Sequence, residues 1–210
     1  MNRFHKTFKM SRKVYAFVII LMSLLGNAQD TLVKNYPETN QRWETIYIKG
    51  KKAKETIYYN TGQSWMNAEY DDKNKEHWKW YHQNGNPFFK ATIINDKIEG
   101  TYQIWYENGQ LAEQLNFKHQ IEEGVAQFYY PNGQLAMRGS YSNGKMIGNW
   151  DFFDKEGHPA DGQWEWPFAA LPDQIRMIGT LENGKRVGKW TYQTTTSGKE
   201  RKQFVEMFEY

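Results

Sequence analysis

Apolar and polar residues alternate along short segments of the chain, and glycines interrupt this alternation at a regular spacing. Gly85, Gly109, Gly133 and Gly157 lie 24 residues apart, and Gly62 precedes them by 23. A second series keeps the same period and consists of Gly100, Gly124 and Gly148, with Gly188 following after 40 residues. Alternation with period two indicates half-buried strands, and a fixed period indicates a repeat architecture. The pattern predicts about six β-hairpin repeats of 24 residues each.

Two turns are expected in each repeat. Asn precedes three glycines of the first series, and Asn-Gly between strands favours a two-residue type I′ turn with positive φ at both residues. The second turns are expected at residues 95–96, 119–120, 143–144 and 183–184. Strands joined only by tight turns must be antiparallel neighbours. We therefore predict an all-β fold, an elongated single-sheet meander over residues 29–210.

Pairing across the first turns predicts one apolar face. The residue five before each glycine should oppose the residue four after it. This face collects Trp78, Trp80, Phe89, Ala91, Tyr102, Ile104, Leu111, Leu115, Phe128, Leu135, Met137, Tyr141, Trp150 and Phe152. Glu113 and Asp154 are its clearest exceptions, which suggests a face only partly sealed from water.

The opposite face is mostly polar but carries a row of rings. The position four before each glycine of the first series is aromatic, and we call these five residues the aromatic row: Tyr58, Tyr81, Trp105, Tyr129 and Phe153. Their expected cross-strand partners are Trp65, Phe88, Ala112, Ala136 and Ala160. Two interpretations stay open, since the rings could simply pack across strands or form a contact surface for a partner.

One segment, residues 158–178, interrupts the repeats as an insertion. It contains Trp164 and Trp166 between turn-forming residues. These rings either cover the apolar face near Phe152 and Trp190 or contact a ligand. At the ends, Thr45–Tyr58 should supply one or two opening strands, and Arg201–Tyr210 a closing strand or a short helix. The candidate partner-binding residues are Tyr58, Trp65, Tyr81, Phe88, Trp105, Tyr129, Phe153, Trp164 and Trp166.

The first 28 residues read as a secretory signal peptide. Five Lys and Arg precede an apolar run from Val14 to Leu25, and Gly26-Asn27-Ala28 forms a small-x-small cleavage site. We expect export to the periplasm or the exterior with cleavage after Ala28, and no transmembrane span afterwards. Subtracting these five from the 27 Lys and Arg leaves 22 against 24 Asp and Glu. A slightly acidic chain gives no reason to expect nucleic-acid binding.

Residues with catalytic or metal-binding chemistry are few and scattered. The chain has no Cys, which excludes disulfides, thiolate metal sites and a lipoprotein anchor. His77 and His82 have opposite strand parity and cannot share a metal. Glu99 and Glu123 occupy equivalent repeat positions, too far apart to share a proton, and Asp71–Glu76 lacks the glycine of a calcium loop. We predict no enzyme, no cofactor and no metal.

The glycine ladder resembles a known family. Tyr141-x-Asn143-Gly144-Lys145-x-x-Gly148-x-Trp150-x-x-Phe153 is echoed by Leu181-x-Asn183-Gly184-Lys185-x-x-Gly188-x-Trp190. The pattern resembles the variant MORN repeat, which bacterial proteins named YwqK-family antitoxins contain. The resemblance implies a β-hairpin repeat fold, links to membrane attachment, dimerisation or scaffolding, and no catalytic residues.

Two functions follow as hypotheses. The first is an exported protein-binding scaffold or immunity module of antitoxin type, because repeat arrays present long surfaces that vary without changing the frame. The alternative is glycan or cell-wall binding, in which Tyr81, Trp105 and Tyr129 would form a platform and Gln103 and Gln127 would supply hydrogen bonds.

Overall fold

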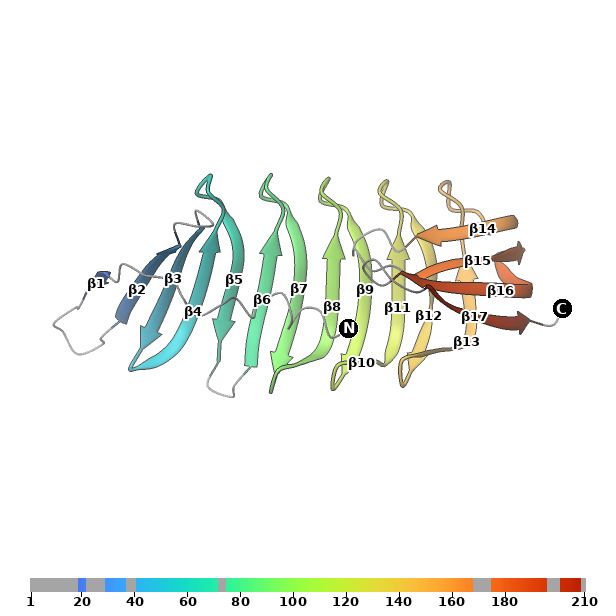
Figure 1. The fold of residues 1–210 in the computed structure, drawn as a ribbon. Coiled ribbons are helices and arrows are strands. Elements are labelled where there is room, and N and C mark those ends of the chain that lie inside the picture. The colour runs from blue at the N-terminus through green and yellow to red at the C-terminus, as the bar shows by residue number, and fades with distance from the viewer. Residues whose placement is uncertain are drawn as a thin grey trace.

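The structure, a computed structural model, describes residues 19–21, 29–36, 41–71, 75–167, 175–195 and 201–208. Within these ranges the chain forms strands and turns only, arranged as two antiparallel sheets side by side (Figure 1). The predicted all-β hairpin meander is confirmed.

The larger sheet is an open meander in which strands pair in chain order. One further short strand of this sheet, β10, lies off this path and pairs with β9. The strands are β1 (Ile19–Leu21), β2 (Gln29–Tyr36), β3 (Gln41–Ile48), β4 (Lys51–Tyr58), β5 (Ser64–Tyr70), β6 (Lys75–Tyr81), β7 (Pro87–Ile94), β8 (Lys97–Trp105), β9 (Leu111–Lys118), β10 (Ile121–Glu122), β11 (Gly124–Tyr129), β12 (Leu135–Ser142) and β13 (Lys145–Phe152).

The last four strands form a second sheet, so the single sheet that the sequence predicted is divided after β13. These strands are β14 (Gly162–Pro167), β15 (Ile175–Glu182), β16 (Lys185–Thr195) and β17 (Arg201–Phe208). After β13 the ladder continues only as an isolated bridge between Phe153 and Pro159. Backbone hydrogen bonds from Phe152 to Gly184 (3.0 Å) and from Gly184 to Ala160 (2.9 Å) tie the two sheets together.

The described part of the insertion and the two segments expected to close the ends of the repeat array form strands. Residues 162–167 of the insertion form β14, whereas residues 168–174 lie outside the described part. Arg201–Phe208 closes the second sheet as a strand rather than a helix. Thr45–Tyr58 contributes to the β3–β4 hairpin, as expected.

Two kinds of turn alternate along the sheet. The second turns lie at the predicted positions, and both of their central residues have positive φ, for example 54° at His119 and 71° at Gln120, so these are the type I′ turns. At the first turns only glycine does, with φ of 89° at Gly85. There Gly85 N–H donates to His82 O (3.0 Å) and His82 N–H to Asn86 O (2.8 Å). This is a three-residue loop with a glycine bulge, so the predicted type I′ turn is wrong at these sites.

The glycine bulge changes which side chains reach the core. Pairings beyond it match the prediction, such as Ile104 with Glu113, but next to the loop Trp105 pairs with Leu111 and not with Ala112. A shift of one residue moves a side chain to the other face of a sheet. Ala112 and Ala136 are consequently buried in the core, whereas Leu111 and Leu135, predicted there, are not.

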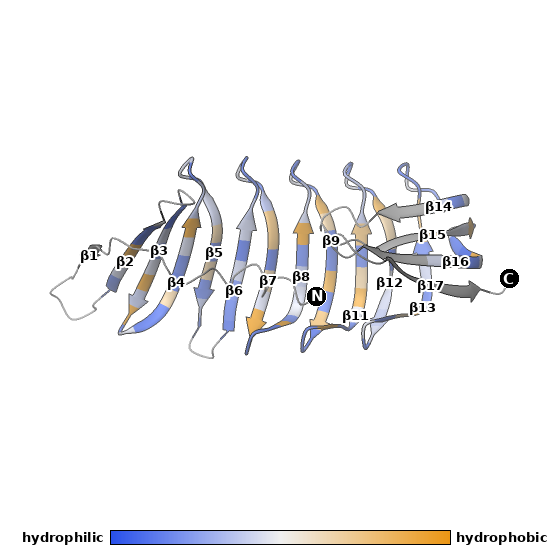
Figure 2. Cartoon of the chain, in the orientation of Figure 1, coloured by the Kyte–Doolittle hydropathy of each residue, from blue (hydrophilic) through white to orange (hydrophobic). Residues whose placement is uncertain are grey.

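The core lies along one side of the meander, which we call the core face. Apolar stretches recur from strand to strand along it (Figure 2). Its rings touch in sequence, with centroids 5.4 Å apart for Trp80 and Phe89, 5.2 Å for Phe89 and Tyr102 and 5.3 Å for Tyr102 and Phe117. Such aromatic pairs stabilise by about 0.5–1.5 kcal/mol each beyond burial alone. The repeats are thus joined through continuous aromatic packing.

The predicted signal peptide lies almost wholly outside the described residues. Its only described part, β1, pairs with Thr31–Val33 of β2. No helix among the described residues is long and apolar enough to cross a membrane. Cleavage after Ala28 stays a prediction, and it would remove β1.

Candidate functional site

The face opposite the core, which we call the open face, carries the aromatic row. All five of its side chains are half-buried, and none belongs to the core cluster or packs against it. The Arg42 guanidinium lies over the ring of Tyr58, 5.2 Å from the ring centroid. The Arg138 guanidinium lies over the ring of Phe153 in the same way, at 5.8 Å. Among the described residues no ring or cation stacks on Trp105 or Tyr129. The centre of the row therefore presents two ring faces on which no described residue stacks.

The bulges give the aromatic row different neighbours from those that the sequence suggested. Trp105 pairs with Leu111 and Tyr129 with Leu135. Tyr81 pairs with Pro87, and Phe153 pairs with Pro159. We call these partners the aliphatic row: Pro87, Leu111, Leu135 and Pro159. Sequence reasoning missed this row, although its signal is present, since Pro or Leu stands two residues after Gly85, Gly109, Gly133 and Gly157. After Gly62 the same position is Ser64, which pairs with Tyr58.

Three candidate binding residues belong to the core instead. Trp65 packs on Trp80 with centroids 5.7 Å apart, and Phe88 is packed against the core cluster. Trp164 is buried, and its ring lies 4.9 Å from Phe152 and 6.1 Å from Trp190. The insertion therefore covers the end of the core face, as the first of its two interpretations expected. The side chain of Trp166 lies outside the described part.

Amide side chains line the middle of the open face beside the aromatic row. Gln103 Nε2 donates to Gln114 Oε1 (2.9 Å), and Gln114 Nε2 donates to Gln127 Oε1 (3.5 Å). Gln103 and Gln127 each stand two residues before a ring of the row, hence on the same face. The arrangement offers hydrogen-bonding groups next to an apolar strip, although the amides already satisfy part of one another's capacity.

Several polar side chains that recur with the repeat connect neighbouring repeats. Tyr106 OH donates to Tyr129 O (2.7 Å) and Tyr130 OH to Phe153 O (2.8 Å). Burial raises the pKa of Tyr106 to about 12, so the hydroxyl stays a donor. His82 Nε2 takes the equivalent role with Trp105 O at 3.0 Å. These side chains connect each repeat to the next.

The turn residues also reach into the next repeat. Asn108 Nδ2 donates to Pro131 O and Asn132 Nδ2 to Lys155 O, at 2.7 and 2.9 Å. Glu99 accepts a bond from His119 N–H (2.7 Å), a contact that lowers the pKa of its carboxyl. Glu123 accepts one from Asn143 N–H (2.8 Å). The two equivalent glutamates therefore cap turns of the following repeat.

The core face contains one pocket of about 210 Å³, which we call the core-face pocket. It spans β6 to β10 and is walled largely by aromatic side chains from those strands. Glu113 lines it and is buried, with 7% of its surface exposed. The described residues give its carboxyl no hydrogen-bond partner, and burial raises the pKa of Glu113 to about 7.

Glu113 is an exception within its own column of residues. The position four after a turn glycine is apolar and buried in three other repeats, as Met66, Phe89 and Met137 show, and after Gly157 it is Asp161, which is exposed. Glu113 is thus the one acidic residue at this position that is buried among the described repeats. A carboxyl costs several kcal/mol to bury without a partner, so the repeat frame alone does not account for it. Unpartnered buried charges in pockets are typical of functional sites.

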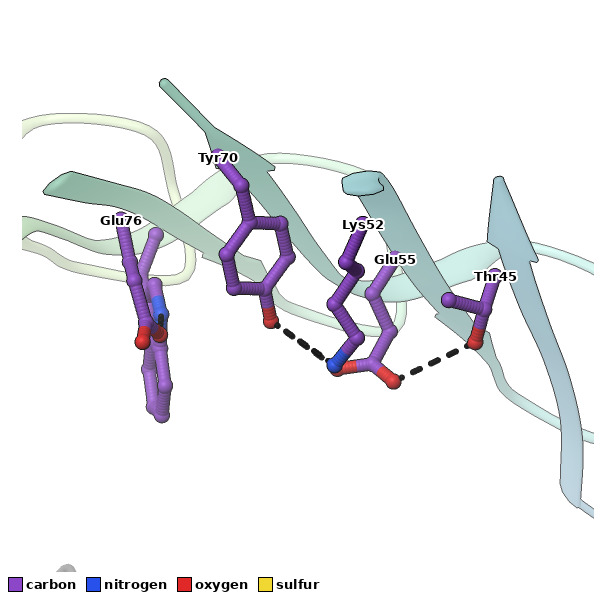
Figure 3. A network of polar contacts seen from close by, with 6 residues as sticks. Thr45, Lys52, Glu55, Tyr70 and Glu76 are labelled. Atoms are coloured by element: carbon purple, nitrogen blue, oxygen red, sulfur yellow. Dashed lines mark hydrogen bonds and ion pairs between the residues drawn. The ribbon is translucent and has the colours of Figure 1, made fainter. Parts of the chain in front are cut away.

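A second polar cluster at the N-terminal end of the core face is satisfied internally (Figure 3). Lys52 Nζ lies 3.2 Å from Glu55 Oε2 and 3.2 Å from Tyr70 OH, and Thr45 Oγ1 donates to Glu55 Oε1 at 3.4 Å. Desolvation and the nearby Glu55 carboxylate raise the pKa of Tyr70. Every charge in this cluster has a partner, and Glu113 differs in this respect.

The fold and its surfaces define an elongated β-hairpin repeat protein with a core face and an open face. In the part of the chain that the structure describes, no three His, Cys, Asp or Glu side chains gather as a metal site would require. Residues 77–95, 98–119 and 122–147 match the family model described as MORN repeat variant. The chain thus contains variant MORN repeats between residues 77 and 147. No curated protein matches the chain.

Proposed function

We propose that this protein is an exported, non-enzymatic scaffold or immunity module of antitoxin type whose open face binds a protein partner. The observation that carries the proposal is the paired strip of the aromatic and aliphatic rows. Its rings are half-exposed and separate from the core, and they recur once per repeat. A long apolar strip on a polar face is typical of contact surfaces rather than of monomer exteriors.

The experiment is affinity capture from an envelope fraction with the tagged, processed protein. Two variants are compared with the wild type: the double variant Trp105→Ala, Tyr129→Ala in the aromatic row, and Lys155→Ala, an exposed turn residue away from it. We expect a specific partner that Lys155→Ala retains and the double variant loses. A partner retained equally by both variants, or no specific partner at several salt concentrations, contradicts the proposal.

Glycan or cell-wall binding is the second candidate, favoured by the amide chain Gln103–Gln114–Gln127 beside Trp105 and Tyr129. Sugar rings stack on flat aromatic faces while neighbouring amides bond their hydroxyls. A glycan array without hits removes this candidate. A hit that the variant Gln114→Ala abolishes supports it over the protein partner.

A further inference from the structure

The core-face pocket is independent of the open face and of the function proposed for it. Its walls come from five consecutive strands, and its aromatic members are Trp78, Trp80, Phe89, Tyr102 and Phe117. Trp80, Phe89, Tyr102 and Phe117 are each less than one-tenth exposed, and these four lie in the continuous ring contacts of the core. Packing fixes the rings in position, so the pocket is a built cavity and not a gap between mobile side chains.

The charged side chains that line the pocket are all acidic, and two of them, Glu76 and Asp96, also line a neighbouring pocket with Lys51 and Lys52. Besides Glu113, carboxylates of Glu76, Asp96 and Glu122 line it, and none of its described lining residues is Lys, Arg or His. Glu76 is partly engaged, because it accepts a bond from Trp78 Nε1 at 2.8 Å. Carboxylates and the negative faces of aromatic rings both favour a cation.

The pocket size and the position of Glu113 restrict that cation further. A volume of about 210 Å³ falls below the roughly 300–1,000 Å³ of pockets for drug-sized ligands. A small metal ion needs several oxygen ligands that converge on one point, and among the described residues no three acidic or His side chains gather in this way. A cation that carries apolar carbons can contact the rings with its carbons and Glu113, the buried carboxylate of the lining, with its charge.

We propose that the core-face pocket binds an alkylammonium group, with its charge at Glu113 and its carbons against Trp80, Phe89 and Tyr102. The group belongs either to a small organic amine or to a lysine side chain of a partner. Bound there, it supplies Glu113 with a partner that the described residues do not provide. The same reason explains why a carboxyl is buried at a position that is apolar in Met66, Phe89 and Met137.

The test is titration calorimetry on the full chain at pH 8 with choline and with its uncharged isostere 3,3-dimethyl-1-butanol. We expect choline to bind at least tenfold more tightly than the isostere, and Glu113→Gln to reduce choline binding by about tenfold or more, the usual loss for one buried charged contact. Equal affinity for the two compounds, or unchanged choline affinity in Glu113→Gln, overturns the proposal.

One further variant and a comparison of two pH values test the role of Glu113 separately from folding. Glu113→Met copies Met66 and Met137 of the same column, so it should fold and lose choline binding. In the wild type, choline binding should weaken about tenfold between pH 8 and pH 5.5 as Glu113 takes up a proton. Glu76, Asp96, Glu122 and Tyr102 also face the pocket, and the pH effect is assigned to Glu113 only if Glu113→Gln abolishes it. A pH effect that persists in this variant contradicts the assignment.

A lysine arm distinguishes the two sources. Nα-acetyl-lysine methylamide is titrated alongside choline. Tighter binding of the lysine compound identifies a partner side chain, and tighter binding of choline identifies a small amine. Either result supports the site, and binding of neither compound overturns it.

Discussion

Trp150 lies flat against Gly139 of the neighbouring strand, so closely that a Cβ on Gly139 would stand 2.1 Å from Trp150 Cδ2. Trp190 covers Gly179 in the same way, at 2.3 Å. In two preceding repeats the residue at the Gly139 position is larger and the residue across from it is smaller than Trp. Ala91 stands across from Tyr102, and Leu115 from Ala126. A larger residue on one strand is thus matched by a smaller one on its neighbour, as close packing requires.

Gly139→Ala should therefore destabilise the fold by at least about 1–3 kcal/mol, the usual cost of overpacking. Adding Trp150→Tyr copies the natural Tyr102 and Ala91 combination and should recover most of the loss. Urea unfolding of the two single variants and the double variant measures the coupling. Additive effects in the double variant would show that the contact does not limit stability.

Asn108 and Asn143 precede glycines alike but serve different purposes. Asn108 does not have positive φ, and its side chain bonds Pro131 O and its own loop, so Asn108→Gly should cost about 1 kcal/mol or more. Asn143 has φ of 50°, which glycine adopts without strain, so Asn143→Gly should be nearly neutral. Thermal or urea unfolding compares the two variants. Equal effects would contradict the assigned roles.

Glu113 should make stability depend on pH. Its pKa of about 7 in the folded protein lies above the ordinary 4.5, so the folded state holds this proton more tightly than the unfolded chain. Its contribution is complete below about pH 4.5 and is lost as pH rises to about 7, which amounts to roughly 2–3 kcal/mol between pH 5 and pH 8. Urea unfolding at both pH values measures it, with Glu113→Gln as the control. The same pH dependence in the control would refute the assignment.

The double variant Trp105→Ala, Tyr129→Ala should lose binding while keeping most of its stability. Each open-face pair contributes only about 0.2–1 kcal/mol. Phe128→Ala is the matched control, since Phe128 neighbours Tyr129 in sequence but is 1% exposed on the core face, and its loss should cost about 3–5 kcal/mol. Calorimetric melting and partner capture are measured together. A large fall in melting temperature of the double variant with capture unchanged would place the aromatic row in the core.

Export with cleavage after Ala28 predicts a mature N-terminus at Gln29. Intact-mass measurement of the protein recovered from a periplasmic fraction checks this. A precursor of unchanged mass in the membrane fraction would instead indicate an uncleaved anchor.

The sequence by itself determined the repeat, the antiparallel meander, the positions of the turns and most of the core face. These features depend on local chemistry, namely a fixed glycine period, alternation with period two and residues that tolerate positive φ. Pairings away from the bulges, such as Trp80 with Phe89 and Tyr102 with Leu115, follow directly from it.

Only the tertiary structure decided which side chains each bulge moves to the other face and which contacts form between neighbouring repeats. Asn-Gly is compatible with two loop types, and the choice of the three-residue loop moved Trp65 and Phe88 into the core and Leu111 and Leu135 out of it. Asn108 is needed because its amide reaches the next repeat, a contact that no local pattern encodes. In the sequence, Glu113 only interrupts an apolar face. In the structure it lines a pocket together with aromatic rings from β6 to β9. Faces, bulges and pockets depend on side chains that meet across strands, which spacing along one strand does not specify.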